Sequence, residues 1–122
     1  LQVKANTAEE GMITSSILEM PADYQKEFLS KDGYTIYKPN KENPCKKCGG
    51  KAFKGRIGIF EMMEMTDELE KIILGTISEA AMRAEAKRQG MITMFQDGIL
   101  KVLQGVVSLE ELLEIAQADD SA

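Results

Sequence analysis

The sequence contains no histidine and no tryptophan, and only two of its 122 residues are cysteines. Without histidine the chain lacks the usual base of a Ser-His-Asp triad and the commonest protein ligand of a metal ion. The two cysteines, Cys45 and Cys48, are too few and too close in sequence to cross-link a secreted domain. These absences exclude much hydrolytic chemistry and favour a reducing compartment, the cytoplasm.

Positive charge is also scarce, because 15 Lys and Arg stand against 20 Asp and Glu, for a net charge of -5. This balance predicts no nucleic-acid partner and no attraction to an anionic membrane surface. No apolar run approaches the roughly 20 residues of a membrane-spanning helix, so no direct membrane span is expected. No GxxxxGK[ST] loop occurs, and nothing in the chain is expected to hold ATP and Mg²⁺. The chain begins at Leu1, which suggests a piece of a longer protein.

The first 43 residues form a weakly patterned, partly helical segment. Apolar residues at helical spacing predict a helix over 8–19 with Thr7 as its N-cap, and Pro21 separates it from a second helix over 22–30. A short strand is expected at 34–37, after the Asp32-Gly33 turn and before Pro39. This part of the chain is interpreted as an insertion or an arm.

Residues 44–65 are predicted to form a tight CxxC turn, or knuckle, followed by a strand or strand pair over 56–65. Ile57, Ile59 and Met63 would lie on one face of that strand. The methionines at 62, 63 and 65 allow two interpretations, a surface that binds partner helices or ordinary core packing, and core packing is the simpler one.

Residues 66–122 read as a helical subdomain with very short connections. Four helices are expected, with N-caps at Thr66, Ser78, Thr93 and Ser108 and ends at about Leu74, Arg88, Gln104 and Ala116. Gly90 is expected as a left-handed C-cap after the second helix, and Gly105 is expected to stop the third. The last two starts have capping-box patterns, Thr93 with Gln96 and Ser108 with Glu111, and residues 118–122 are expected to be an acidic, frayed tail. The fold class is therefore α+β: a small strand element next to the CxxC knuckle, followed by a C-terminal bundle of short helices.

Cys45 and Cys48 are the residues with the clearest chemical potential. Two thiolates two residues apart can chelate one metal ion, but structural zinc takes four nitrogen or sulfur ligands. One interpretation is half a zinc site whose partner pair lies outside the chain. A second is a pair of structural thiols without metal. A thioredoxin-like redox pair is the least favoured, because Pro44 and two glycines surround the motif where a helix start is required.

Several linked motifs then follow one another. They are Cys45-x-x-Cys48, KGRIGIFE at 54–61, GMITM at 90–94, FQDG at 95–98, and Lys101-Val102-x-x-Gly105-x-x-Ser108-x-Glu110-Glu111. Their order and spacing resemble the C-terminal end of the type II secretion and type IV pilus assembly ATPases, from about residue 45 to residue 116. Residues 1–43 would be the variable segment between that family's two CxxC pairs.

The resemblance implies a parent protein that is a RecA-like, hexameric ATPase on the cytoplasmic face of the inner membrane. Such proteins hydrolyse ATP and pass domain motion to a membrane platform protein, and two CxxC pairs form their zinc-bearing subdomain. Cys45 and Cys48 match the second pair, while the first pair and the nucleotide-binding segments have no counterpart here. We therefore expect an incomplete zinc site and no ATPase activity from this chain alone.

The remaining motif residues suggest structural or contact roles. Gly55 and Gly58 flank Arg56, which could contact a carboxylate of the ATPase core or of a neighbouring subunit, or form a surface salt bridge within the domain. Asp97 suits a helix start, and Gly98 is expected to permit close helix approach. Two rival functions stay open: a free-standing helical interaction or scaffold domain, and a small zinc-binding module that completes its site by dimerisation.

Overall fold

The computed structural model describes residues 1–40, 42, 45–50 and 52–120 of the chain. The described elements follow the order β1 (Gln2–Lys4), α1 (Thr7–Leu18), α2 (Ala22–Phe28), β2 (Thr35–Tyr37), the 3-10 turn η1 (Lys46–Cys48), α3 (Asp67–Leu74), α4 (Glu79–Arg88), α5 (Met94–Leu103) and α6 (Leu109–Asp120). The predicted α+β class is confirmed. The predicted division at residues 43 and 44 and the last two residues of the predicted tail lie outside the described residues.

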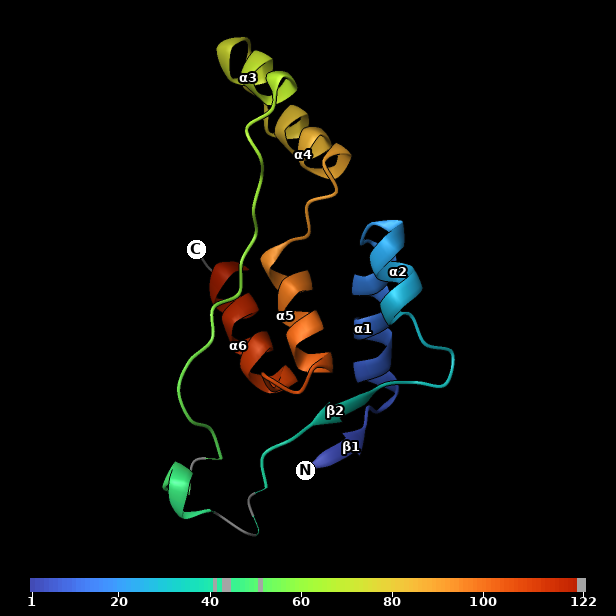
Figure 1. Cartoon of the computed structure of the whole chain (residues 1–122), viewed down its shortest axis with the longest axis vertical. Coiled ribbons are helices and arrows are strands. Elements are labelled where there is room, and N and C mark those ends of the chain that lie inside the picture. Colours follow the sequence, from blue (N-terminus) through green and yellow to red (C-terminus); the bar gives the residue numbers. More distant parts are fainter. Residues whose placement is uncertain (41, 43–44, 51, 121–122) are drawn as a thin grey trace.

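The sheet of the described part has two antiparallel strands, β1 and β2, with Val3 opposite Ile36. Main-chain hydrogen bonds extend the pairing at both ends: the Ala5 N–H donates to the Tyr34 carbonyl at 2.9 Å and the Lys38 N–H donates to the Leu1 carbonyl at 2.8 Å. The strand expected near 34–37 is confirmed as β2. Strand β2 packs against α5, and the small sheet lies in the lower part of the molecule (Figure 1).

The strand predicted over 56–65 is wrong, because the structure has no strand in this segment. The chain runs there as a long extended stretch that passes from the cysteine turn to the start of α3 (Figure 1). Apolar alternation is present, but a strand also needs a neighbouring backbone to complete its ladder of hydrogen bonds. Within the described residues no such neighbour exists. The strands of the described part are β1 and β2, in the first 40 residues, and not a strand element after the cysteine turn.

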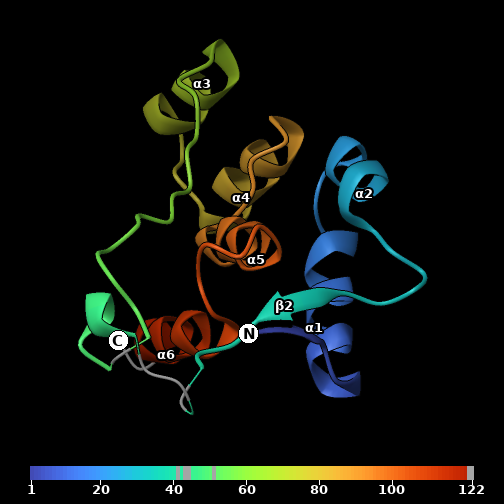
Figure 2. The same cartoon turned by 60° about the horizontal axis from the view of Figure 1, so that its bottom comes forward.

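The hydrophobic core brings together the two ends of the sequence. Its largest fully buried side chains come from α1, β2, α5 and α6, and they are Ile13, Ile17, Ile36, Ile99, Val102 and Leu112. Helix α5 lies between α6 and α1 in both views (Figures 1 and 2). The first 40 residues therefore supply one wall of the core that covers α5.

The predicted single C-terminal bundle is also wrong in its arrangement. Helix α3 packs on α4, and α5 packs on α6, α1 and β2, so the helices form two separate pairs. The α3–α4 hairpin projects from the body of the molecule, at the end opposite the cysteine turn (Figure 1). In the turned view of Figure 2, α3 still lies apart from α5 and α6.

Capping signals placed most helix starts correctly. Thr66 and Ser78 cap α3 and α4, and Thr93 forms the expected capping box with Gln96 at the start of α5. At α1 the N-cap is Asn6 and not Thr7, because Asn6 has Glu9 three residues later and the two complete a capping box. Helix α2 ends at Phe28, two residues early, and α6 continues to Asp120 beyond its expected end.

Candidate functional site

The cysteine turn is built on a short 3-10 helix. Cys45 precedes this turn, and Gly49 and Gly50 follow it with φ of 60° and 83°, a conformation that suits glycine. Both cysteines are free thiols, and their Sγ atoms lie 3.2 Å apart. The turn is exposed at the lower end of the molecule (Figure 1). The structure thus brings the two predicted ligands together at the surface.

The local environment favours the thiolate form of Cys48. A hydrogen bond from the Cys45 thiol, aided by the main chain of Ala52 and Gly50, lowers the pKa of the Cys48 thiol below its ordinary value. A thiolate is the form that binds zinc. The two sulfur atoms are therefore close enough for one cation to contact both.

The two thiols fit half of a zinc site. Two sulfurs on one tetrahedral zinc ion lie about 3.8 Å apart, given zinc–sulfur bonds of about 2.3 Å, so the Sγ atoms need to separate only slightly. In the part of the chain that the structure describes, no group of three or more Cys, His, Asp or Glu side chains could hold a metal. Zinc binding and the knuckle therefore stay predictions.

The extended segment is held on helix α5 by side chains. The carboxylate of Asp97 accepts a hydrogen bond from the Phe60 N–H at 2.9 Å, and the Lys101 ammonium donates to the Gly58 carbonyl at 2.9 Å. Lys101 also forms an ion pair with Asp97 one helical turn away and lies 5.3 Å from the centre of the Phe60 ring. Two charged side chains of α5 thus replace the missing neighbouring strand.

One further contact ties the segment to the beginning of α5. The Glu61 carboxylate accepts a hydrogen bond from the Met94 N–H at 3.1 Å, which is one of the unpaired N–H groups of the first helical turn. An anionic side chain is favourable at this end of a helix. Thr93, which the sequence singled out, stands beside this contact as the N-cap.

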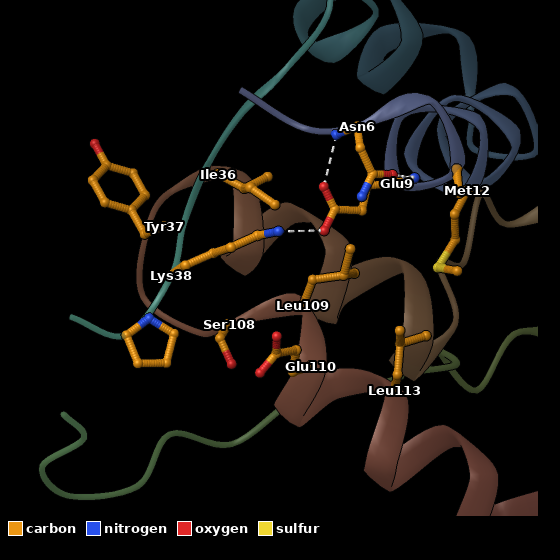
Figure 3. Close-up of a pocket in the computed structure, with 12 residues that line it drawn as sticks. Asn6, Glu9, Met12, Ile36, Tyr37, Lys38, Ser108, Leu109, Glu110 and Leu113 are labelled. Carbon is orange, nitrogen blue, oxygen red and sulfur yellow. Dashed lines mark hydrogen bonds and ion pairs between the residues drawn. The ribbon is translucent and has the colours of Figure 1, made fainter. Parts of the chain in front are cut away.

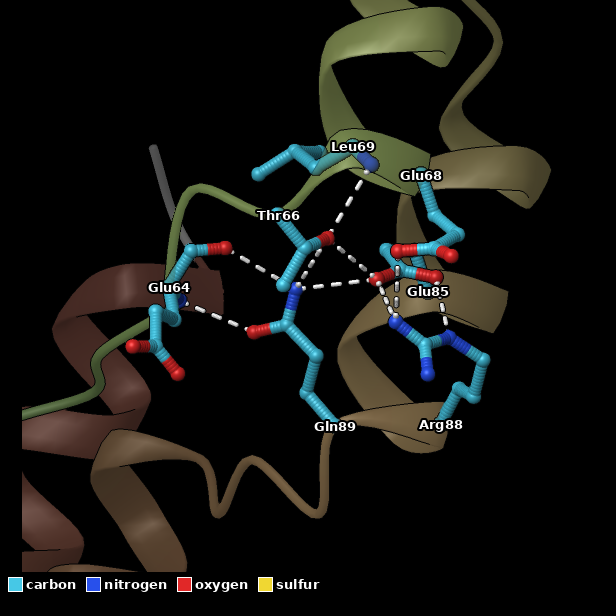
Figure 4. Close-up of polar contacts among 7 residues, drawn as sticks. All are labelled: Glu64, Thr66, Glu68, Leu69, Glu85, Arg88 and Gln89. Atoms are coloured by element: carbon cyan, nitrogen blue, oxygen red, sulfur yellow. Dashed lines mark hydrogen bonds and ion pairs between the residues drawn. The ribbon is translucent and has the colours of Figure 1, made fainter.

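The upper end of the segment is held by Gln89 at the end of α4. Its amide oxygen accepts from the Glu64 N–H at 2.9 Å, and its amide nitrogen donates to the Glu64 carbonyl at 2.9 Å (Figure 4). The same nitrogen donates to the Glu85 carboxylate at 3.0 Å. This pair of bonds imitates the pairing of two β-strand residues.

Glu85 is the centre of the surrounding polar cluster (Figure 4). Its buried carboxylate accepts hydrogen bonds from Arg88, Gln89 and Thr66, at 2.6 to 3.0 Å. These donors, Arg88 foremost, lower the pKa of Glu85 to about 2. Thr66 is also the N-cap of α3, so the cluster locks the start of α3 to the end of α4.

The hydrogen bonds of the extended segment follow a period of two. Gly58, Phe60 and Glu64 use their main-chain groups toward α5 and Gln89. In extended chain the groups of alternate residues point to the same side, so those of the odd-numbered residues point to the opposite side. Within the described residues, the main-chain groups of residues 57, 59, 61, 63 and 65 have no hydrogen-bond partner. The main-chain groups of Met62, on the first side, are likewise unpaired among the described residues. The segment therefore has one edge that is held at Gly58, Phe60 and Glu64 and one edge that is open along its length.

Side chains of the segment are exposed as well. Met62 and Met65 are 81% and 68% exposed, so the expectation that they pack in the core is wrong. Ile59 is half-buried against the core, and Ile57 is 50% exposed. The segment has the composition of a strand but lies on the surface.

Arg56 lies where the cysteine turn meets the extended segment. Its side chain is exposed and makes no ion pair or hydrogen bond with another described residue. It lines a groove of about 820 Å³ that lies between the chain after the cysteine turn, the end of β2 and the start of α6. The salt bridge considered within the domain is not formed with any described carboxylate, and a contact of Arg56 with another domain or subunit stays a prediction.

Two of the glycines that the motifs contain have clear structural roles. A Cβ on Gly98 would lie 2.3 Å from Leu112 Cδ1, so the absent side chain allows α5 and α6 to approach closely. Gly90 has φ of 75° and ends α4. Gly58 and Gly105 face the rings of Phe60 and Tyr37, while Gly55 has open space around it. At the start of α6 the Glu111 N–H donates to Ser108 Oγ at 3.2 Å, half of the predicted capping box.

A second, smaller cavity lies between α1, β2 and α6. It has a volume of about 210 Å³, and apolar side chains including Met12, Leu109 and Leu113 form much of its lining (Figure 3). Lys38 forms an ion pair with Glu9 at its edge, at 2.8 Å. This hydrogen bond, together with the Asn6 N–H, lowers the pKa of Glu9. The cavity is a gap between elements of the core, and Ser108, one of the predicted structural motif residues, is among the residues that line it.

Sequence reasoning gave no contact role to Glu61, Glu85, Gln89 or Lys101, although Glu61 and Lys101 stand in its motifs. A local signal existed for two of them, because Asp97 and Lys101 are four residues apart on a helix and Glu85 and Arg88 are three apart. The bonds from Gln89 to Glu64 and from Met94 to Glu61 join residues 25 and 33 positions apart, and no local pattern announces them.

These features define a module whose extended segment joins a cysteine turn to a projecting helical hairpin. The chain belongs to the family described as Type II/IV secretion system protein, whose model matches residues 8–114. The resemblance drawn from the motifs is therefore confirmed. The match begins at residue 8, so it includes α1 and β2 as well as the region after Cys45.

Curated relatives give the same result. The chain is 41% identical over 69 residues to the type IV pilus assembly ATPase PilB of Thermus thermophilus, which covers 57% of this chain and 8% of the relative. It is 34% identical over 97 residues to PilB of Acinetobacter baylyi, covering 80% and 16%. The type II secretion system ATPase E of Vibrio cholerae is 36% identical over 73 residues, covering 60% and 14%.

The chain thus spans 8% to 16% of the length of these relatives. No solved structure gives a significant match. Among the described helices, none is long and apolar enough to cross a bilayer.

Proposed function

We propose that this chain is the C-terminal, non-nucleotide-binding part of an ATPase that powers type II secretion or type IV pilus assembly. The matching relatives are named as ATPases of both processes, and the chain contains no phosphate-binding loop of its own. In this proposal the remainder of the protein binds ATP and Mg²⁺ and forms a hexamer at the cytoplasmic side of the inner membrane. The module passes the resulting motion to a membrane platform protein.

The observation that carries this proposal is the open edge of the extended segment. Five alternate residues leave their main-chain groups without partners among the described residues, while Asp97, Lys101 and Gln89 occupy the other edge. An exposed, unpaired edge with strand-like composition is a template for pairing with another chain segment. We infer that this edge joins the module to the remainder of the ATPase.

The arrangement also suggests how motion would travel through the module. A displacement of the extended segment acts on α5 through Asp97 and Lys101 and on the α3–α4 hairpin through Gln89 and Thr66. Both attachments are short hydrogen-bonded contacts to helices, which transmit displacement as stiff elements. The hairpin would then move with the segment.

The cysteine turn would supply two of the four thiolates of a zinc site in the full protein. Its sulfurs lie near the required spacing, and the lowered pKa of Cys48 favours the metal-binding form. Bound zinc would hold together two chain segments without taking part in ATP chemistry. A second copy of this chain could also complete the site. Metal analysis of the isolated chain together with native mass spectrometry distinguishes the two cases, since one zinc ion per dimer would indicate a site built from two chains.

Amide hydrogen exchange tests the proposal. In the isolated chain, the amides of Ile57, Ile59 and Met63 should exchange quickly while those of Phe60 and Glu64 are protected. In the full-length ATPase all five should be protected. Equally fast exchange of the odd-numbered amides in both proteins would reject the open edge as the junction. Saturable ATP turnover by the purified 122-residue chain would contradict the assignment of nucleotide chemistry to the remainder of the protein.

A further inference from the structure

Helix α3 presents two different faces. Leu69 is buried, and Ile72, three residues later, is half-buried on the side toward α4. Asp67, Glu70 and Leu74 are spaced three and four residues apart, so they share the opposite, outward side. These three residues are called the α3 face below.

The α3 face combines exposed apolar surface with negative charge. Leu74 is 78% exposed, and Ile77 just beyond the helix end is 64% exposed. Neither Asp67 nor Glu70 forms an ion pair with another described residue, and Lys71 is the cation on this side. Leu74 and Ile77 are exposed three residues apart and have carboxylates beside them, which fits the pattern of apolar surface rimmed by polar groups at interaction sites.

Charge around the α3 face is mostly negative, although Lys71 lies on the same side of the helix and Arg88 pairs with Glu68 beside it. Residues 57–70 contain five acidic residues, Glu61, Glu64, Asp67, Glu68 and Glu70, and no Lys or Arg. Met65, immediately before the N-cap of α3, adds a side chain that is 68% exposed. Complementarity therefore calls for a partner with positive charge and apolar side chains on one surface.

The position of the face suits such a partner. The α3–α4 hairpin projects from the end of the molecule opposite the cysteine turn (Figure 1). Within the described residues nothing covers the outward side of α3, since Asp67, Glu70 and Leu74 are all exposed. An anionic lipid surface would repel this face, whereas segments of membrane proteins on the cytoplasmic side are rich in Lys and Arg.

We propose that the α3 face docks a cationic amphipathic helix of the kind that the cytoplasmic segment of a membrane protein presents. This inference rests on the proposed function only for the identity of the partner as the membrane platform. Apolar residues of the helix would cover Leu74 and Ile77, and its Lys or Arg side chains would pair with Asp67 and Glu70. The carboxylates would set the orientation and the apolar contact would supply most of the affinity.

Binding of a labelled peptide to the purified chain tests this proposal. The probe is a peptide of leucine and lysine at helical spacing, followed by fluorescence anisotropy, with a scrambled peptide of the same composition beside it. We expect saturable binding of the amphipathic peptide. The double variant Asp67→Asn, Glu70→Gln should bind about fivefold more weakly, because two exposed ion pairs are lost. Leu74→Ala should also weaken binding, and it leaves the fold intact because the side chain is exposed.

A matched control is available on α2. Asp23 and Glu27 are exposed acidic residues at the beginning and near the end of that helix, so Asp23→Asn, Glu27→Gln makes the same change in net charge elsewhere. This control should bind as the unchanged chain does. Equal weakening by both double variants, or equal binding of the scrambled peptide, would overturn the proposal in favour of unspecific charge attraction. That outcome would leave the open edge and its exchange test untouched.

Discussion

The side-chain amide of Gln89 binds both main-chain groups of Glu64, with two hydrogen bonds of 2.9 Å each. A glutamine side chain here does for the extended segment what a neighbouring strand would do in a sheet. The contact joins residues 25 positions apart and fixes the place where the α3–α4 hairpin leaves the body of the molecule.

Replacing Gln89 with alanine removes this tie. We expect Gln89→Ala to lower the free energy of unfolding by about 1 kcal/mol, because its two exposed hydrogen bonds with Glu64 and its bond to the Glu85 carboxylate are lost. The Glu64 amide should lose its protection in hydrogen exchange. Gln104→Ala is the control, since that side chain is exposed at the end of α5. Unchanged protection of the Glu64 amide in Gln89→Ala would contradict the role given to this side chain.

Acid should weaken the hairpin attachment through Glu85. The pKa of Glu85 is lowered from 4.5 to about 2, chiefly by Arg88. A carboxylate with a lowered pKa in the folded state stabilises the fold at pH values above its ordinary pKa, and this contribution disappears as the pH falls toward about 2. Glu85→Gln should therefore be less stable than the unchanged chain at neutral pH. It should also lose less stability than the unchanged chain as the pH falls from 4.5 to about 2.

Urea unfolding midpoints from neutral pH down to about pH 2 measure this effect. Glu79→Gln is the matched control, because Glu79 pairs with Arg83 in the same helix but is 77% exposed. Solvent screens such a pair, so the control should follow the unchanged chain. Parallel pH profiles for Glu85→Gln and the unchanged chain would show that the cluster does not respond to acid.

Asp97 should prove important for holding the extended segment. Asp97→Ala removes the acceptor for the Phe60 N–H and the partner of Lys101, and we expect a loss of about 1 to 2 kcal/mol in the free energy of unfolding. Asp97→Asn keeps an oxygen acceptor without the charge, so it should retain part of the protection of the Phe60 amide. An alanine variant with full protection of that amide would remove the basis for the contact.

Two glycines in helices should respond in opposite ways to alanine. Gly98→Ala places a methyl group against Leu112 between α5 and α6, and we expect destabilisation by about 1 to 2 kcal/mol. Gly11→Ala, in α1 with open space around the glycine, should stabilise the chain by about 0.5 to 1 kcal/mol. Thermal or urea unfolding of the two variants measures both effects. If both variants were more stable than the unchanged chain, α5 and α6 could move apart without loss of free energy of unfolding.

Helix starts could be predicted from sequence because their information is local. Thr66, Ser78 and Thr93 each accept a hydrogen bond from an N–H three residues later, so a window of four residues contains the signal. At α1 both Asn6 and Thr7 are good N-caps, and Glu9 decides between them by completing the capping box with Asn6. Weighing that glutamate would have placed the cap correctly.

The extended segment could not be predicted in the same way. Its alternating composition is that of a strand, but strand formation depends on a second backbone that the described residues do not provide. The adjacency of Cys45 and Cys48 followed from their spacing, whereas the Gln89–Glu64 contact depends on how α4 folds back. Long-range side-chain contacts to main chain leave no periodic trace in the sequence.

Because Glu64 and Gln89 are hydrogen-bonded neighbours, the chain between them leaves the body and returns to nearly the same point. Residues 65–88 are therefore a closed excursion, which a short turn between these two residues could replace without pulling on α5 or the core. Different proteins with this body could exchange, lengthen or omit the excursion while keeping the body's fold. The hairpin is thus the part of the module that evolution, or an engineer, can alter independently of the rest.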